Sequence, residues 1–220
     1  HRDLHSFPTR RSSDLVPAEL GEALRQLQAQ EQIPVLFVTH DLQEAATLAT
    51  QVAVLIDGSL RQMGSGRDIL TRPADRDVAL LTRARNILPG KVQSTVDGSF
   101  VRTAIGDVPL RSSGEAVVSG GLVDVVIRPE AWRLDAPEAR FDLERFVCTG
   151  TLLEIRDHGL SLLLRVAVGE TVLEVLRPYG ADPTGVGGTM SVVGAPVVLS
   201  ATLDDVHLLP VAQPEERGAG

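Results

Sequence analysis

The first third of the chain alternates between helix-like and strand-like patterns of apolar residues. Leucines recur at helical spacing between positions 20 and 27, which predicts a helix that begins near Pro17. Residues 33–38 form an apolar run rich in β-branched side chains and too short for a helix. This run predicts a strand buried on both faces. An amphipathic stretch follows directly at Asp41 and predicts a second helix.

A hairpin and two short helices are predicted next. The expected elements are strands at 52–56 and 60–63 and helices at 67–70 and 75–84. Asp57-Gly58 lies between the two strands and is a strong signal for a two-residue hairpin turn. Pro73 ends the first of the two short helices.

The pattern changes near Arg85, where short apolar or alternating runs begin, separated by Gly, Pro and Asp turns. The predicted strands are 87–93, 99–103, 108–110, 122–127, 149–156, 160–166, 171–176 and 196–199. Asp97-Gly98 and His158-Gly159 are suitable hairpin turns. Many short strands at this spacing indicate a small β-barrel or sandwich.

His40 lies between the carboxyl end of the predicted strand and the start of the helix that follows it. Asp41 can cap that helix, and Glu44 stands three positions later, at the spacing of a capping box. In open α/β sheets, ligands bind at this edge of the sheet. The simpler alternative is that His40 only satisfies nearby backbone carbonyls, while Thr39 and Asp41 shape the turn.

The stretch from Ile33 to Pro73 resembles the switch-histidine segment of ATP-binding-cassette (ABC) transporter ATPases. The residues that carry the resemblance are Thr39-His40-Asp41, the helix from Glu44, the strand–Gly turn–strand at 52–64 and the short helix before Pro73. The resemblance implies that His40 contacts the γ-phosphate of ATP and helps to hold the attacking water. Glu44 either completes the cap or faces a transmembrane subunit.

The second part of the chain resembles the regulatory β-domain, called TOBE, of one class of binding-protein-dependent importers. Three matches in the expected order carry this resemblance: 86–92 (Asn-Ile-Leu-Pro-Gly-Lys-Val), 127–130 (Ile-Arg-Pro-Glu) and 203–210 (Leu-Asp-Asp-Val-His-Leu-Leu-Pro). The fold class implied is the C-terminal portion of an ABC-type P-loop α/β nucleotide-binding domain, followed by an all-β, OB-like small barrel.

These observations divide the chain into four segments. Residues 1–14 are basic and lack periodicity, so we expect a non-native or disordered segment. Residues 15–84 correspond to the C-terminal part of the nucleotide-binding domain and residues 85–210 to the TOBE-like β-domain. Residues 211–220 are rich in Pro, Glu and Gly and are expected to be disordered.

The resemblance implies a C-terminal fragment of the ATP-binding subunit of an importer. Its partners would be transmembrane permease subunits, a second ATP-binding subunit in a homodimer and, indirectly, a solute-binding protein. Its location would be peripheral, at the cytoplasmic face of the bacterial inner membrane, and its cofactors would be ATP and Mg²⁺. The transported solute cannot be read from the sequence.

A phosphate loop of the type Gly-x-x-x-x-Gly-Lys-Ser/Thr is missing from the sequence. Its only lysine is Lys91, which precedes Val92 rather than a hydroxyl residue. The signature motif and the catalytic glutamate of the family are also not found. We therefore expect that this chain alone neither hydrolyses ATP nor binds it tightly.

Composition limits the other function classes. The formal net charge is −8 and only 3% of residues are aromatic, which argues against a nucleic-acid partner. Cys148 is the single cysteine and lies in an apolar stretch, so a buried, unreactive thiol is expected. No apolar run reaches the length that spans a bilayer.

The remaining candidate residues have simpler structural interpretations. Arg128, Pro129 and Glu130 either line a regulatory or oligomer contact or form a strand-ending turn with a surface ion pair, and we favour the turn. Trp132 is expected to pack in the core or at an interface, and His158 to lie at a hairpin tip. His207 lacks neighbours at metal-ligand spacing, so no metal site is assigned.

Two alternatives to the importer subunit stay open at this point. One is a free-standing β-barrel module that binds a small anion or oligosaccharide, with residues 15–84 as a helical cap. The other is an aberrant open reading frame without a function of its own.

Overall fold

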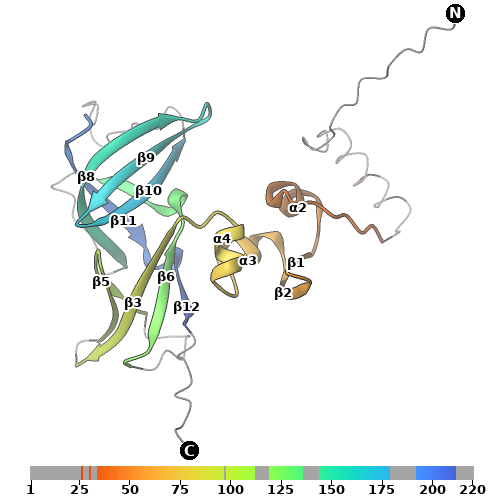
Figure 1. Ribbon diagram of the computed structural model, residues 1–220, viewed down its shortest axis with the longest axis horizontal. Helices are drawn as coiled ribbons and strands as arrows, with labels where there is room; N and C mark the ends of the chain where they lie inside the picture. The colour runs from red at the N-terminus through yellow and green to blue at the C-terminus, as the bar shows by residue number, and fades with distance from the viewer. Residues whose placement is uncertain are drawn as a thin grey trace, which may run out of the picture.

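Strands are the main regular secondary structure that the computed structural model describes, and all but β1 and β2 lie after residue 85 (Figure 1). The structure describes residues 26, 30, 34–96, 98–111, 119–135, 144–178 and 192–211. We call residues 34–85 the leading part and residues 86–211 the β-rich part. No helix within these described ranges has the length and apolar character needed to cross a membrane.

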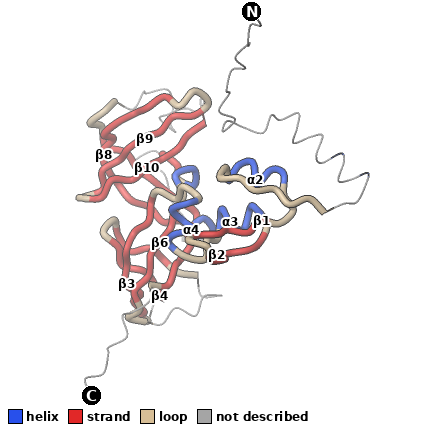
Figure 2. The backbone as a smooth tube through the Cα atoms, turned by 45° about the vertical axis from the view of Figure 1, so that its right-hand side comes forward, coloured by secondary structure: helices blue, strands red, loops and turns tan. Residues whose placement is uncertain are grey.

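The leading part is a cluster of short elements beside the β-rich part (Figure 2). Its elements are α2 (Leu42–Leu48), β1 (Val52–Ile56), β2 (Ser59–Gly64), α3 (Gly66–Thr71) and α4 (Arg76–Leu81). β1 and β2 pair antiparallel, and the turn between them has positive φ at Asp57 (50°) and Gly58 (75°). This is the geometry expected of a two-residue hairpin turn, so the predicted hairpin is confirmed.

Two side-chain caps and one close contact define the short helices. Ser65 accepts a hydrogen bond from the backbone N–H of Asp68 at the start of α3, and Asp75 accepts one from Val78 at the start of α4. A Cβ on Gly66 would lie 2.6 Å from the Cα of Ala46, so only glycine allows α3 to pack this closely against α2. The helices predicted at 67–70 and 75–84 are thus confirmed, the second with a shorter span.

The predicted buried strand at residues 33–38 was wrong for the residues that can be compared. Residues 34–39 have no regular secondary structure, and Leu36 and Val38 are 94% and 87% exposed. A strand buried on both faces needs a neighbouring strand on at least one side and covering elements on both faces. None of the described strands pairs with this run. The helix predicted from Pro17 falls almost entirely outside the described residues.

The strands of the β-rich part form two five-stranded antiparallel sheets. Their orders are β12-β6-β3-β4-β5 and β10-β9-β8-β11-β7. The bounds are β3 (Asn86–Thr95), β4 (Gly98–Thr103), β5 (Gly106–Pro109), β6 (Leu122–Ile127), η1 (Pro129–Ala131), β7 (Arg133–Asp135), β8 (Arg145–Asp157), β9 (Ser161–Val168), β10 (Thr171–Pro178), β11 (Pro196–Thr202), η2 (Leu203–Asp205) and β12 (Val206–Pro210). The prediction that this half of the chain is built of strands is confirmed.

Sequence patterns missed two of these strands. β7 has three residues, and two of them are charged, so it carries no hydrophobic alternation. β12 lies directly after a short 3-10 turn, and its apolar residues are interrupted by His207. Both strands form because a neighbour supplies the hydrogen bonds: β11 pairs with β7, and β6 pairs with β12.

One continuous apolar core joins the two sheets. Alternate residues of the strands supply it, and Trp132 lies in it with no exposed surface, packed edge-on against Phe146 at 6.1 Å between ring centroids. Trp132 therefore has the core position expected from the sequence. Cys148 is also buried in this core, as predicted. His158 is exposed at the β8–β9 hairpin, beside Gly159 with a φ of 80°.

Asn86 is a buried polar residue that connects the two sheets. Its side-chain amide donates to the carbonyl oxygens of Ile127 at 3.0 Å and Glu174 at 2.8 Å, and its Oδ1 accepts from the N–H of Glu174 at 2.8 Å. Ile127 belongs to β6 and Glu174 to β10, so one side chain bridges both sheets. β10 is the outer strand of its sheet, and the Asn86 amide makes the backbone hydrogen bonds to Glu174 that a further strand would otherwise make.

We expect Asn86→Ala to destabilise the β-rich part by about 2–4 kcal/mol, because it leaves buried backbone groups without partners. Urea unfolding followed by the fluorescence of Trp132, the only tryptophan, measures the free energy of unfolding. Ser94→Ala is a matched control, because it removes an exposed side-chain hydrogen bond to Ser99. An Asn86 variant no less stable than this control would contradict the bridging role.

The thiol of Cys148 should be unreactive in the folded protein. Burial raises the pKa of this thiol from 9.0 to about 12, so the reactive thiolate is scarce at pH 8–9. The unfolded chain loses this proton at lower pH than the folded chain, so alkaline conditions above pH 9 favour unfolding. We expect slow alkylation by iodoacetamide at pH 8.5 and fast alkylation in 6 M urea, with mass spectrometry as the readout. Equal rates in the two conditions would contradict the buried position.

Candidate functional site

The turn that carries His40 is organised by three hydrogen bonds around the start of α2. Asp41 Oδ1 accepts from the N–H of Glu44 at 3.2 Å, and Thr39 Oγ1 accepts from the N–H of Asp41 at 2.9 Å. The Thr39 hydroxyl donates to Glu44 Oε2 at 2.8 Å. The predicted Asp41 cap is confirmed. Glu44 closes the cap through Thr39 and not through the backbone N–H of Asp41.

His40 is exposed at the tip of this turn. Among the described residues, its imidazole has no hydrogen-bond or ion-pair partner, so the alternative of a histidine that satisfies backbone carbonyls finds no support there. An exposed imidazole fixed between a capped helix and an extended segment can donate to an anionic oxygen of a bound ligand. Its role in contacting ATP stays a prediction.

The residues present do not by themselves fit the triphosphate of a nucleotide. Lys91 lies within strand β3, where it pairs with Arg102 of β4 and Leu122 of β6. A phosphate loop requires its lysine at the junction of a glycine-rich loop and a helix. The described residues also contain no group of three or more His, Cys, Asp or Glu side chains placed to hold a metal ion.

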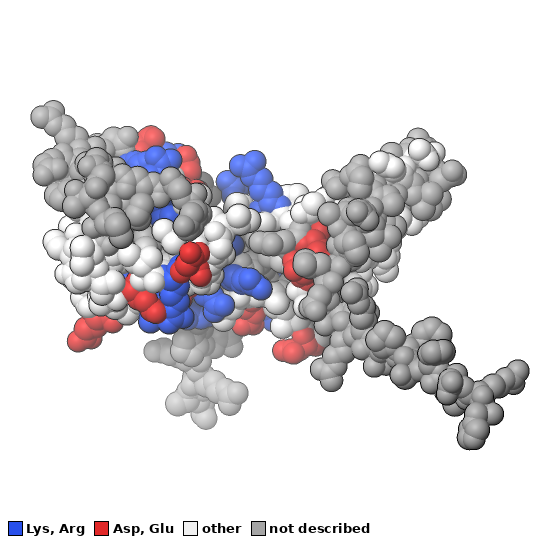
Figure 3. Space-filling view, turned by 90° about the horizontal axis from the view of Figure 1, so that it is seen from above, with Lys and Arg blue, Asp and Glu red and all other residues white. Residues whose placement is uncertain are grey.

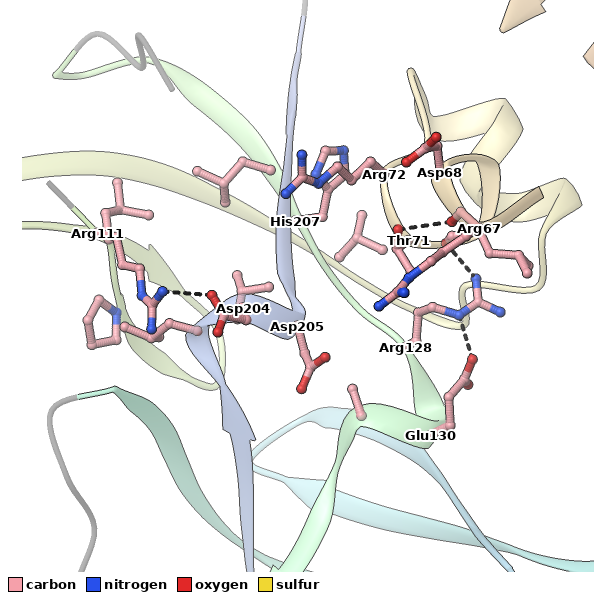
Figure 4. Close-up of a pocket in the computed structure, with 18 of the residues that line it drawn as sticks. Arg67, Asp68, Thr71, Arg72, Arg111, Arg128, Glu130, Asp204, Asp205 and His207 are labelled. Atoms are coloured by element: carbon pink, nitrogen blue, oxygen red, sulfur yellow. Dashed lines mark hydrogen bonds and ion pairs between the residues drawn. The ribbon is translucent and has the colours of Figure 1, made fainter. Parts of the chain in front are cut away.

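The junction between the leading part and the β-rich part is the best-connected polar site in the described ranges. At its centre is Arg128, which follows β6 and has an 18% exposed side chain. Its Nη1 donates to the carbonyl oxygen of Leu70 at 3.1 Å and its Nη2 to that of Thr82 at 3.0 Å. Its Nε donates to Glu130 Oε1 at 2.5 Å (Figure 4).

These contacts place the Arg128 guanidinium at the C-terminal ends of two helices. Leu70 is in the last turn of α3, and Thr82 is the C-cap residue of α4. The final carbonyls of a helix lack partners within the helix and carry a partial negative charge, so a cation is favourable there. Arg128 therefore satisfies both helix ends and ties them to the β-rich part.

Two further polar contacts and an apolar cluster complete the junction. Arg76 Nη1 of α4 lies 2.5 Å from Asp124 Oδ2, and Asp124 is almost fully buried. His207 Nε2 of β12 lies 2.9 Å from the carbonyl oxygen of Pro73. Apolar side chains from both parts pack together beside these contacts: Ala79, Ala84, Ile87, Val126 and Leu209.

The preferred interpretation of Arg128 as part of a simple surface turn was therefore incomplete. The expected ion pair with Glu130 is present, and Pro129 begins the 3-10 turn η1. The other two guanidinium nitrogens, however, contact residues 58 and 46 positions away. Sequence spacing gives no signal for such distant partners. The resemblance at 127–130 was the only pointer to this site.

A groove of about 1140 Å³ opens between α3 and the β-rich part, next to this junction. Its walls come from α3, from the ends of β5 and β6, and from η1, β7, η2 and β12. The charged and ionisable side chains that line it are Arg67, Asp68, Arg72, Arg111, Arg128, Glu130, Arg133, Asp204, Asp205 and His207. On the face of the molecule shown in Figure 3, basic and acidic side chains are interspersed, without a large area of one sign.

Comparison with known proteins gives import ATP-binding proteins among the sequence relatives of this chain. The chain is 34% identical over 161 residues to a spermidine/putrescine import ATP-binding protein of Ruegeria pomeroyi, covering 73% of this chain and 42% of that protein. It is 27% identical over 169 residues to an Fe(3+) ions import ATP-binding protein of Fusobacterium nucleatum, covering 74% of this chain and 44% of the relative. No model of a known protein family matches the chain.

This chain is homologous to part of the ATP-binding subunits of ABC importers. It spans less than half the length of these curated relatives. A match that covers 73% of a 220-residue chain must include residues on both sides of position 85. The similarity to ABC-importer subunits therefore extends over the leading part and the β-rich part together.

Among solved structures, a molybdate-bound form of the cytoplasmic molybdate-binding protein ModG aligns with 58% of this chain and 97% of its own. The TM-score is 0.45 and the sequence identity is 20%.

We expect Arg128→Gln to loosen the junction while the core of the β-rich part stays folded. The substitution removes two charge-assisted bonds to helix carbonyls, each worth about 1.5–3 kcal/mol. Hydrogen exchange of the amides that close α3 and α4, those of Arg72 and Thr82, should become at least about tenfold faster, equivalent to about 1.4 kcal/mol.

Arg102→Gln provides the control for this experiment. Arg102 forms an exposed ion pair with Asp107 on neighbouring strands β4 and β5, and such pairs contribute little to stability. Unchanged exchange in α3 and α4 of the Arg128 variant would show that the other contacts hold the junction without Arg128.

Proposed function

We propose that the chain forms the closing part of the nucleotide-binding domain and the regulatory β-domain of an ABC importer's ATP-binding subunit. The observation that carries this proposal is the 34% identity over 161 residues to an import ATP-binding protein, which extends over both parts of the chain. The Arg128 junction supports it, because it couples the segment after His40 mechanically to the β-rich part.

In this role the chain supplies one nucleotide-sensing side chain and a rigid platform. His40 would donate a hydrogen bond to the γ-phosphate of ATP, and the capped turn of Thr39, Asp41 and Glu44 would hold its position. A bound Mg²⁺ would neutralise phosphate charge during hydrolysis. The phosphate loop and the magnesium-binding carboxylates would come from sequence that is not in this chain.

The same role sets the partners and the location. Permease subunits in the membrane and a second ATP-binding subunit would assemble with the intact protein at the cytoplasmic face of the membrane, and a solute-binding protein would deliver the solute. The relatives are named for different solutes, polyamines in one case and Fe(3+) ions in another. The proposal therefore leaves the solute open and places specificity in the partner proteins.

A chimaera tests the proposal. Residues 15–210 replace the matching region of the import ATP-binding protein of Ruegeria pomeroyi, and magnesium-dependent ATP hydrolysis is measured. We expect activity in the chimaera and a loss of about ten- to hundredfold in turnover with His40→Ala, because one hydrogen bond to a charged phosphate is worth about 1.5–3 kcal/mol.

His158→Ala is the control in the same chimaera, because His158 is an exposed hairpin residue away from the His40 turn. A folded chimaera without any ATP hydrolysis would contradict the proposed function. Full activity with His40→Ala would contradict the role of His40 alone. The unmodified 220-residue chain should show no magnesium-dependent turnover.

A further inference from the structure

The groove beside α3 gathers arginines in a protein whose net charge is −8. Five of them line it, Arg67, Arg72, Arg111, Arg128 and Arg133. They come from α3, from the segment after β5, from the end of β6 and from β7. Segments far apart in the sequence thus bring guanidinium groups to one cavity.

Three of these guanidinium groups are available to a ligand. Arg111 pairs with Asp204 at 2.7 Å, and Arg128 pairs with Glu130. Arg67, Arg72 and Arg133, in contrast, form no side-chain hydrogen bond or ion pair with any residue in the described ranges. Five of the described arginines outside the groove do have a carboxylate partner: Arg61, Arg76, Arg102, Arg156 and Arg165.

Two acidic side chains of the groove accept hydrogen bonds from neighbouring hydroxyl groups. Asp68 accepts a hydrogen bond from the hydroxyl of Ser65 at 2.6 Å, and Asp205 accepts one from Thr202 at 2.6 Å. Figure 4 shows Arg67 and Arg72 on the α3 wall together with Arg128, while Arg111 and Asp204 lie on the opposite side. The α3 side of the groove thus carries Arg67 and Arg72 together with Asp68, and Arg128 lies there with its partner Glu130.

The size and rigidity of the groove indicate what kind of ligand would fit. Its volume of about 1140 Å³ lies slightly above that of typical small-molecule sites, roughly 300–1,000 Å³, and exceeds what a single tetrahedral anion would fill. Arg128 links α3 to the β-rich part, and the apolar cluster packs α4 against it, so the walls are already in place before a ligand binds. Guanidinium groups bind phosphate oxygens through two parallel hydrogen bonds.

We propose that this groove binds a small polyphosphate-type anion, with Arg67 and Arg72 as its principal ligands. Adjacent phosphate groups would contact different arginines, so affinity should rise with the number of linked phosphates. Apolar residues at the base of the groove, Leu70, Val126 and Leu208, would accommodate the organic portion of a phosphorylated metabolite. The site is separate from the His40 turn and does not depend on the proposed ATPase role.

Isothermal titration calorimetry on the full 220-residue chain at about 0.1 M ionic strength tests this proposal. The probes are orthophosphate, pyrophosphate and tripolyphosphate. We expect affinity to increase in that order and the double variant Arg67→Gln/Arg72→Gln to weaken tripolyphosphate binding by at least about tenfold, which corresponds to about 1.4 kcal/mol.

The double variant Arg83→Gln/Arg85→Gln is the matched control. It removes the same charge from two exposed arginines that lie outside the groove, and it should leave the affinity for tripolyphosphate within about twofold. Equal loss in both double variants would show binding by net charge only and would overturn the proposal. The absence of heat with every probe would overturn it too. Thermal unfolding of the unliganded variants, monitored through Trp132, verifies that each one is folded.

Discussion

The contact of Arg128 with the ends of two helices is the interaction on which the arrangement of this chain depends. α3 and α4 have six residues each, and helices of that length are not stable on their own in water. Their terminal carbonyls find a cation supplied by the β-rich part. This contact fixes where the leading part lies, and the groove beside α3 exists because of it.

The β-rich part can serve as a support because its core is continuous. Residues from both sheets contribute to one apolar cluster around Trp132, and burial of this kind is the main source of stability in folded proteins. Asn86, the first residue of β3, adds a polar link between β6 and β10. Asn86 lies close in the chain to residues of the Arg128 junction. The link between the two sheets and the contact with the leading part are therefore neighbours.

The leading part has a different character. Its core is small, with one cluster of four buried apolar residues (Val52, Val54, Ile69 and Val78), and the side chains of Val35, Leu36 and Val38 are exposed. The hairpin also exposes Leu55, Leu60 and Met63. These surfaces contrast with the closed core of the β-rich part. In the proposed role, the remainder of a nucleotide-binding domain would cover them and bring phosphate-binding groups towards His40.

The sequence by itself determined the features that depend on neighbouring residues. The Asp57-Gly58 turn, the Asp41 cap and most of the strands follow from local backbone preferences and hydrophobic spacing. Tertiary structure alone decided the role of Arg128, the bridge made by Asn86 and the position of the groove. The partners of Arg128 in the leading part and those of Asn86 lie 41 to 88 residues away. Hydrophobic spacing cannot specify such pairs. For the same reason residues 34–38 do not form the predicted strand: a strand needs a hydrogen-bonding partner, which an apolar pattern cannot supply.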